Sequence, residues 1–148
     1  MAKPVAGEWI EDNFRAIAFC GVTHMVSLLE PQEIRELGLT KAPDLCAANG
    51  MGFVNFPIRD RGLPPSVAAA CALVNEIFLG IEAGSHTVIH CRAGIGRTGL
   101  IAAAVMVRAG YAAEEAFATV SLNRGVKVPD TPEQYEWVVA QQRALRGS

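Results

Sequence analysis

The sequence predicts a single α/β domain in which helices flank a mainly parallel central sheet. Short apolar runs typical of buried strands alternate along the chain with longer segments of helical periodicity. No Pro/Gly/Ser-rich linker and no internal repeat divides the 148 residues, a length usual for one domain. One strand leads directly into a glycine-rich loop and then a helix. In parallel sheets such a loop lies at the carboxyl edge, where ligands bind.

The first half of the chain begins with a short lead-in over 1–7, which we expect to be mobile. The predicted elements that follow are a helix over 8–21, a strand over 24–29, helices over 31–37 and 44–48, and a strand over 52–58. Gly21 and Gly38 are placed to end helices, and Pro31 is placed to begin one. The last of these strands leads into a loop over 59–65 that is rich in Gly and Pro.

The second half alternates in the same way. The predicted elements are a helix over 66–83, a strand over 87–90, a helix from about 98 to 109, and helices over 113–122 and 131–144. Ser66 is a suitable N-cap for the first helix. Its expected inner face comprises Val67, Ala70, Val74, Ile77 and Ile81. We leave residues 146–148 out of the fold as an extraneous tail.

Composition excludes several classes of protein. Hydrophobic residues make up 51% of the chain and charged residues 19%, which is enough apolar material for a core. A formal net charge of -2 provides no basic field for nucleic acid. The apolar runs are too short to cross a bilayer, and no signal peptide opens the chain. The four cysteines form no CxxC pair. We therefore expect a cytoplasmic protein with no nucleic-acid, membrane, metal or cofactor partner. The sequence does not give the oligomeric state, for which we favour a monomer.

The segment after the strand over 87–90 carries the clearest chemical signal. Three glycines, Gly94, Gly96 and Gly99, permit unusual backbone torsions, so successive N–H groups can converge on one anion. The following helix adds its positive N-terminal end. Arg97 offers a planar fork that matches a pair of phosphate oxygens. Cys91 lies at the mouth of this anion site, where the same donors would stabilise a thiolate. The pattern indicates attack by sulfur on a bound phosphate ester.

Such an attack requires a proton donor for the leaving alcohol. Asp60 follows a predicted strand and is flanked by Arg59 and Arg61, so it is the candidate donor. Thr98 is placed to hydrogen-bond the departing thiolate, and His90 is placed to orient the loop.

These residues resemble a known family. His90-Cys91-x5-Arg97-Thr98 is similar to the signature of the cysteine-dependent protein tyrosine phosphatases. The segment 56–65 resembles the acid loop of the small dual-specificity branch, and 122–134 resembles the stretch that ends in the family's water-positioning glutamine. The likeness extends over about residues 8–139 and is greatest to the kinase-associated phosphatase group and its small prokaryotic relatives.

The resemblance implies roles for individual residues. Cys91 would be the nucleophile, Asp60 the acid and then the base, Thr98 the support for the leaving thiolate, and Gln134 the residue that places water. The phosphoryl oxygens would be bound by Arg92, Ala93, Gly94, Ile95, Gly96 and Arg97. Glu33 would pair with Arg97, with Glu30 as the alternative. The implied activity is hydrolysis of phosphotyrosine, and of phosphoserine or phosphothreonine, in a phosphorylated protein substrate.

The chain also departs from the family. Only residues 1–7 stand where the family usually has a strand before the first helix, so we expect that edge to be short, trimmed or absent. No segment resembles the loop that deepens the pocket of large tyrosine phosphatases. Ala93 and Ile95 stand where phosphoinositide phosphatases tend to have lysines, although Arg92 adds one charge nearby. Two other functions therefore stay open. One is a phosphatase of inositol phosphates or another small phosphorylated metabolite, and the other is a catalytically silent phosphate-docking module.

Structural alternatives exist for each candidate. They are a buried packing thiol for Cys91, a turn-stabilising carboxylate for Asp60, a core imidazole for His90, a helix cap for Thr98 and a solvated helix residue for Gln134. Arg124 is expected to be structural. If Cys91 is oxidised, Cys46 is the preferred resolving thiol.

Overall fold

A three-stranded parallel sheet lies at the centre of the protein, with strand order β2-β1-β3. The structure is a computed structural model that describes residues 1–147. In β1 (His24–Ser27), each residue is paired in register with one of β2 (Gly52–Asn55) and one of β3 (Thr87–His90). Because the strands are parallel, the loops that follow them meet at one edge of the sheet. This arrangement confirms the predicted fold class.

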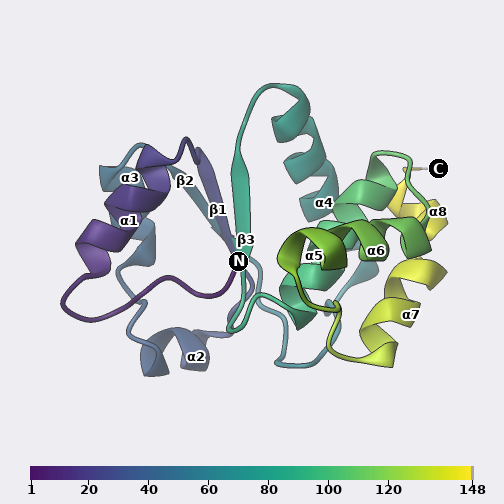
Figure 1. Ribbon diagram of the computed structural model, residues 1–148, viewed down its shortest axis with the longest axis horizontal. Coiled ribbons are helices and arrows are strands. Elements are labelled where there is room, and N and C mark those ends of the chain that lie inside the picture. Colours follow the sequence, from purple (N-terminus) through teal and green to yellow (C-terminus); the bar gives the residue numbers. More distant parts are fainter. Residues whose placement is uncertain (148) are drawn as a thin grey trace.

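Helices cover both faces of the sheet (Figure 1). One face carries α1 (Ile10–Phe19), α2 (Pro31–Glu36) and α3 (Ala42–Ala48). The other carries α4 (Val67–Glu82), α5 (Gly96–Arg108), α6 (Ala113–Arg124), α7 (Pro132–Ala140) and α8 (Gln142–Leu145).

Neighbouring residues of β1 fill two separate cores. Met25 packs with Phe14 and Cys46 under α1 and α3. Val26 packs with Val74 and Leu100 under α4 and α5. Successive side chains of a strand point to opposite faces, so a strand buried on both sides needs the continuous apolar run that this segment has.

Several predicted boundaries are corrected by the structure. The first two strands end at Ser27 and Asn55, earlier than expected, while α5 begins at Gly96, two residues before the expected position. The helix expected over 131–144 is interrupted at Gln141 and forms α7 and α8. The helix expected over 44–48 begins at Ala42.

The expected inner face of α4 is wrong at its two ends. Val67 and Ile81 are 38% and 47% exposed, whereas Leu73 is 5% exposed. A helix of 16 residues is about 24 Å long, and the four-residue strands beneath it are only about 13 Å long. The ends of α4 therefore extend beyond the sheet. Its N-cap is the predicted one, because the Ser66 side chain accepts a hydrogen bond from the Ala69 N–H at 3.2 Å.

The expectation that residues 1–7 are mobile is also wrong. The amino nitrogen of Met1 donates to the Ile89 carbonyl at 2.6 Å, and the Lys3 N–H donates to the Arg92 carbonyl at 3.1 Å. The N-terminus consequently lies beside the end of β3 (Figure 1).

At the other end of the chain, the Arg146 guanidinium donates to the carbonyl of Tyr111 at 3.1 Å, so this residue contacts the fold. Ser148, the last residue of the expected tail, lies outside the described residues. Within residues 1–147, no helix has the length and apolar character needed to span a membrane.

Candidate active site

The Cys91 loop, residues 91–96, follows β3 at the carboxyl edge of the sheet and ends with the first residue of α5. Cys91 is 3% exposed. Its Sγ accepts a hydrogen bond from the Gly94 N–H at 3.3 Å and another from the Thr98 hydroxyl at 3.0 Å. Thr98 lies in the first turn of α5, and its hydroxyl donates to the Cys91 sulfur. The N-cap of that helix is Ile95, so Thr98 is not the helix cap. Two hydrogen-bond donors therefore converge on the sulfur.

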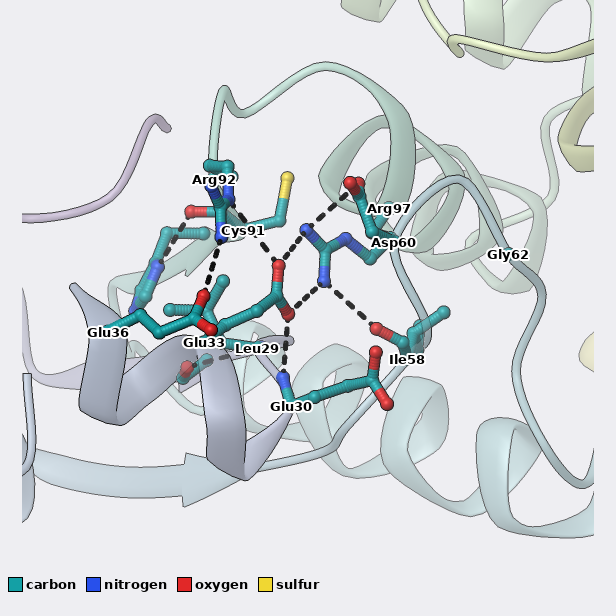
Figure 2. Close-up of polar contacts among 12 residues, drawn as sticks. Leu29, Glu30, Glu33, Glu36, Ile58, Asp60, Gly62, Cys91, Arg92 and Arg97 are labelled. Atoms are coloured by element: carbon teal, nitrogen blue, oxygen red, sulfur yellow. Dashed lines mark hydrogen bonds and ion pairs between the residues drawn. The ribbon is translucent and has the colours of Figure 1, made fainter.

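Arg97 is held in a fixed orientation by Glu33 (Figure 2). Its Nη1 and Nη2 donate to the two carboxylate oxygens of Glu33 at 2.7 and 3.0 Å, and Nη1 also donates to the Ile58 carbonyl at 3.0 Å. The Arg97 side chain is 2% exposed and that of Glu33 is 10% exposed. Burial alone would lower the pKa of Arg97, but the hydrogen bonds and charge of Glu33 raise it, so the guanidinium stays charged.

The structure brings Glu33 to Arg97, and not the alternative Glu30. Glu33 is the third residue of α2, and its carboxylate also accepts the N–H of Glu30 at 2.9 Å. Burial alone would raise the pKa of Glu33, but hydrogen bonds from Arg97 and Glu30 lower it overall. The same carboxylate lies 3.6 Å from the Arg92 guanidinium, which also approaches Glu36 at 3.9 Å (Figure 2).

Asp60 lies on the side of the Arg97 guanidinium that faces away from Glu33 (Figure 2). Its Oδ1 accepts from Arg97 Nη2 at 3.3 Å, and its side chain is 62% exposed. The loop after β2 turns sharply here, because Arg61 has a φ of 57°, in the left-handed region that few side chains adopt. Arg61 is 4.0 Å from Asp130, which ties the outer side of this loop to the segment before α7.

Gln134 is fully buried, so the solvated alternative is wrong. Its Oε1 accepts from the N–H groups of Asp130 and Thr131 at 3.1 and 3.2 Å, and its Nε2 donates to the Gly62 carbonyl at 3.2 Å. A Cβ added at Gly96 would lie 3.1 Å from that Oε1. Gln134 thus joins the start of α7 to the Asp60 loop, next to the Cys91 loop.

His90 lies at the end of β3 and is 1% exposed. Burial lowers its pKa to about 4, so the imidazole is neutral near pH 7. Its Nδ1 is 3.2 Å from the Cys91 carbonyl. His90 is therefore a buried core imidazole, and its role in orienting the Cys91 loop stays a prediction.

Cys46 is not placed to act as a resolving thiol for Cys91. It is a fully buried residue of α3 with its Sγ 3.9 Å from Met25 Sδ, in the core on the other face of the sheet from Cys91. Burial also raises the pKa of Cys46 to about 11, which disfavours its thiolate.

Arg124 is a site neighbour that sequence reasoning left as merely structural. Its Nε donates to the Gly94 carbonyl at 3.2 Å and its Nη2 to the Ala93 carbonyl at 3.4 Å. The sequence could have indicated this position, because Arg124 lies within 122–134, the segment that resembles the phosphatase stretch ending in the water-positioning glutamine. Within residues 1–147, no group of three or more His, Cys, Asp or Glu side chains is placed to hold a metal ion.

Comparisons with known proteins point to one family. The model described as "Polymorphic toxin system, DSP-PTPase phosphatase" matches residues 1–111. Cyclin-dependent kinase inhibitor 3 of Sus scrofa is 25% identical over 131 residues, which are 87% of this chain and 61% of the relative. Protein tyrosine phosphatase domain-containing protein 1 of Bos taurus is 28% identical over 130 residues, which are 71% of this chain and 16% of the relative. The chain thus spans less than two thirds of either protein.

Solved structures share the fold. Kinase associated phosphatase, with its catalytic-site cysteine replaced by serine, superposes with a TM-score of 0.88 at 21% identity, over 99% of this chain and 86% of the other. PTPMT1 in complex with PI(5)P superposes with a TM-score of 0.82 at 19% identity, over 99% and 90%. The chain therefore belongs to the DSP-PTPase phosphatase family of polymorphic toxin systems, within the small dual-specificity branch of the cysteine-dependent protein tyrosine phosphatases.

Proposed function

We propose that the protein hydrolyses phosphate monoesters of phosphorylated proteins, phosphotyrosine and also phosphoserine or phosphothreonine, through a cysteinyl-phosphate intermediate. The observation that carries this proposal is the orientation of Arg97. Glu33 holds the guanidinium by two hydrogen bonds beside the loop whose donors surround Cys91 Sγ. A phosphoryl group placed over the sulfur would meet this fixed cation and the N–H groups of the loop.

In the first step, the Cys91 thiolate attacks phosphorus and the bond between phosphorus and the ester oxygen breaks. The leaving oxygen takes a proton from Asp60 and departs as a neutral alcohol or phenol. The phosphoryl oxygens are bound by Arg97 and by the loop residues Arg92, Ala93, Gly94, Ile95 and Gly96. Because these donors are already oriented, little reorganisation opposes the development of charge.

In the second step, water attacks phosphorus and gives its proton to the Asp60 carboxylate. The sulfur–phosphorus bond breaks, inorganic phosphate is released, and the thiolate re-forms. The Thr98 hydroxyl, 3.0 Å from Sγ, stabilises the returning charge. We assign Gln134 the placement of this water, which its position between the Asp60 loop and Gly96 supports.

A phosphorylated inositol is the second candidate substrate. It is supported by the fold shared with PTPMT1, whose complex contains PI(5)P. Ala93 and Ile95 argue against it, because neither adds a cation for a second phosphate.

A panel of substrates tests the proposal. Phosphate release would be measured from phosphotyrosine and phosphothreonine peptides, inositol phosphates and an aryl phosphate, with a chelator throughout and Cys91→Ser beside the wild type. We expect turnover on the phosphopeptides that the chelator leaves unchanged and the substitution abolishes. Faster release from inositol phosphates would favour the second candidate. Tungstate binding without turnover on any substrate would favour a phosphate-docking module.

The family description also supports a role in a toxin system. If dephosphorylation harms a host cell, expression of the wild type slows growth and expression of Cys91→Ser at the same level does not. Equal growth of the two cultures would argue against that role. Cytoplasmic location and a monomeric state stay predictions, which fractionation and sedimentation would check.

A further inference from the structure

The outer side of the Cys91 loop is held by two segments that are distant in sequence. On one flank, the Lys3 N–H donates to the Arg92 carbonyl at 3.1 Å. On the other flank, Arg124 donates to the Gly94 carbonyl at 3.2 Å and to the Ala93 carbonyl at 3.4 Å. Three consecutive carbonyl groups of the loop therefore have partners outside it.

The direction of these carbonyls determines where the anion-binding N–H groups point. In a planar trans peptide, the carbonyl of one residue and the N–H of the next point in opposite directions. Holding the carbonyls of Arg92, Ala93 and Gly94 outward turns the N–H groups of Ala93, Gly94 and Ile95 toward the inside of the loop. The Gly94 N–H accordingly points at Cys91 Sγ, 3.3 Å away.

Gly94 has no Cβ, which leaves room for the backbone of residues 1–3 beside the Cys91 loop. Its φ of 76° lies in the left-handed region, and a Cβ there would overlap the backbone of Met1 and Ala2. The loop and residues 1–3 are consequently in direct backbone contact.

We infer that Arg124 is a positioning residue for the phosphatase reaction, and that it acts together with residues 1–3 by fixing the peptide planes of the Cys91 loop. The inference rests on the proposed function and extends it to groups that do not touch the substrate. Arg124 acts through the geometry of two carbonyls and not through its charge alone. A guanidinium can span both acceptors, whereas a lysine ammonium offers one point of donation.

Tungstate affinity, measured in the Cys91→Ser background, reports the anion site without requiring turnover. We expect Arg124→Met to weaken tungstate binding about tenfold and to lower kcat/KM for an aryl phosphate by a similar or larger factor. Arg124→Lys keeps the charge and should recover only part of each loss. Arg146→Met is the matched control, because Arg146 also donates to a backbone carbonyl, that of Tyr111, away from the Cys91 loop.

A second pair of variants tests the other flank. Lys3→Pro removes the N–H that meets the Arg92 carbonyl, whereas Lys3→Ala removes the same side chain and keeps that N–H. We expect Lys3→Pro to bind tungstate at least threefold more weakly than Lys3→Ala, in line with the loss of one net hydrogen bond. Equal affinity in this pair would overturn the role of residues 1–3.

Two results would overturn the role of Arg124. One is wild-type tungstate affinity in Arg124→Met, and the other is full recovery by Arg124→Lys, which would assign the effect to charge. If the wild type lacked turnover but bound tungstate, the proposed function would fail. The affinities of the Arg124 and Lys3 variants would still decide the inference.

Discussion

The carboxylate of Asp60 accepts a hydrogen bond from Nη2 of Arg97 at 3.3 Å, so the proposed proton donor and the proposed phosphate-binding cation touch each other. Arg97 Nη2 also donates to Glu33, and Nη1 donates to Glu33 and to the Ile58 carbonyl. A phosphate that accepts two hydrogen bonds from the Arg97 guanidinium must therefore displace Asp60, which is the one exposed residue among the partners of Arg97.

The substitution Asp60→Asn distinguishes two proposed effects of Asp60, its competition with phosphate for Arg97 and its donation of a proton. Removing the carboxylate charge leaves Arg97 with a weaker competitor, so we expect tighter tungstate binding. The same change removes the proton donor, so kcat for an alkyl phosphate should fall about 100-fold. An aryl phosphate with a good leaving group should be affected much less. Equal losses on both substrates would contradict the acid role, as would weakened tungstate binding.

Glu33→Gln should damage both folding and anion binding. The substitution leaves the Arg97 guanidinium, 2% exposed, without its buried ionic partner, and breaking a buried pair costs about 3–5 kcal/mol. We expect a lower unfolding midpoint in urea and at least a tenfold loss of tungstate affinity. Glu36→Gln is the control, because the Glu36 side chain is 55% exposed and contacts Arg92 and Gln32 rather than Arg97. Similar behaviour of the two variants would refute the special role of Glu33.

His90 should make the protein less stable in acid. The unfolded chain protonates this imidazole near pH 6.5, whereas burial holds the folded pKa at about 4. Between these values the unfolded state binds more protons, so the free energy of unfolding falls as the pH falls, by about 3 kcal/mol in total. Urea unfolding at pH 7 and pH 4.5 measures the loss. In His90→Asn the loss should shrink by most of that amount, and an unchanged loss would place its cause elsewhere.

Gly94→Ala should impair the site more than its backbone strain alone would. Gly50 is a matched comparison, because both glycines have positive φ, 76° and 72°, but a Cβ at Gly50 meets no atom within 4 Å. We expect both variants to lose about 1 kcal/mol of stability from strain. Only Gly94→Ala should lose tungstate affinity, since its Cβ displaces the backbone of Met1 and Ala2. Retained affinity in Gly94→Ala would show that this contact is dispensable.

The fold class and the Cys91 loop could be predicted because their signals are local. Strand, glycines, Arg97 and helix are consecutive, and the torsions and dipoles of that segment suffice to indicate an anion site. The boundaries that were wrong depend on distant partners. Val67 and Ile81 continue the apolar periodicity of α4, but the strands beneath are too short to cover them.

By itself, the sequence determined the α/β class, the order of its elements and the identity of the chemical groups, since periodicity and loop residues act within a few positions of the chain. Only the tertiary structure decided which of those groups meet. It chose Glu33 over Glu30 for Arg97, buried Gln134 against the Asp60 loop, placed Cys46 on the far face of the sheet, and brought residues 1–3 and Arg124 to opposite flanks of the Cys91 loop. The physical reason is that hydrogen bonds and burial depend on distance in space. Residues up to 88 positions apart become neighbours only when parallel strands and packed helices bring their ends to one edge of the sheet.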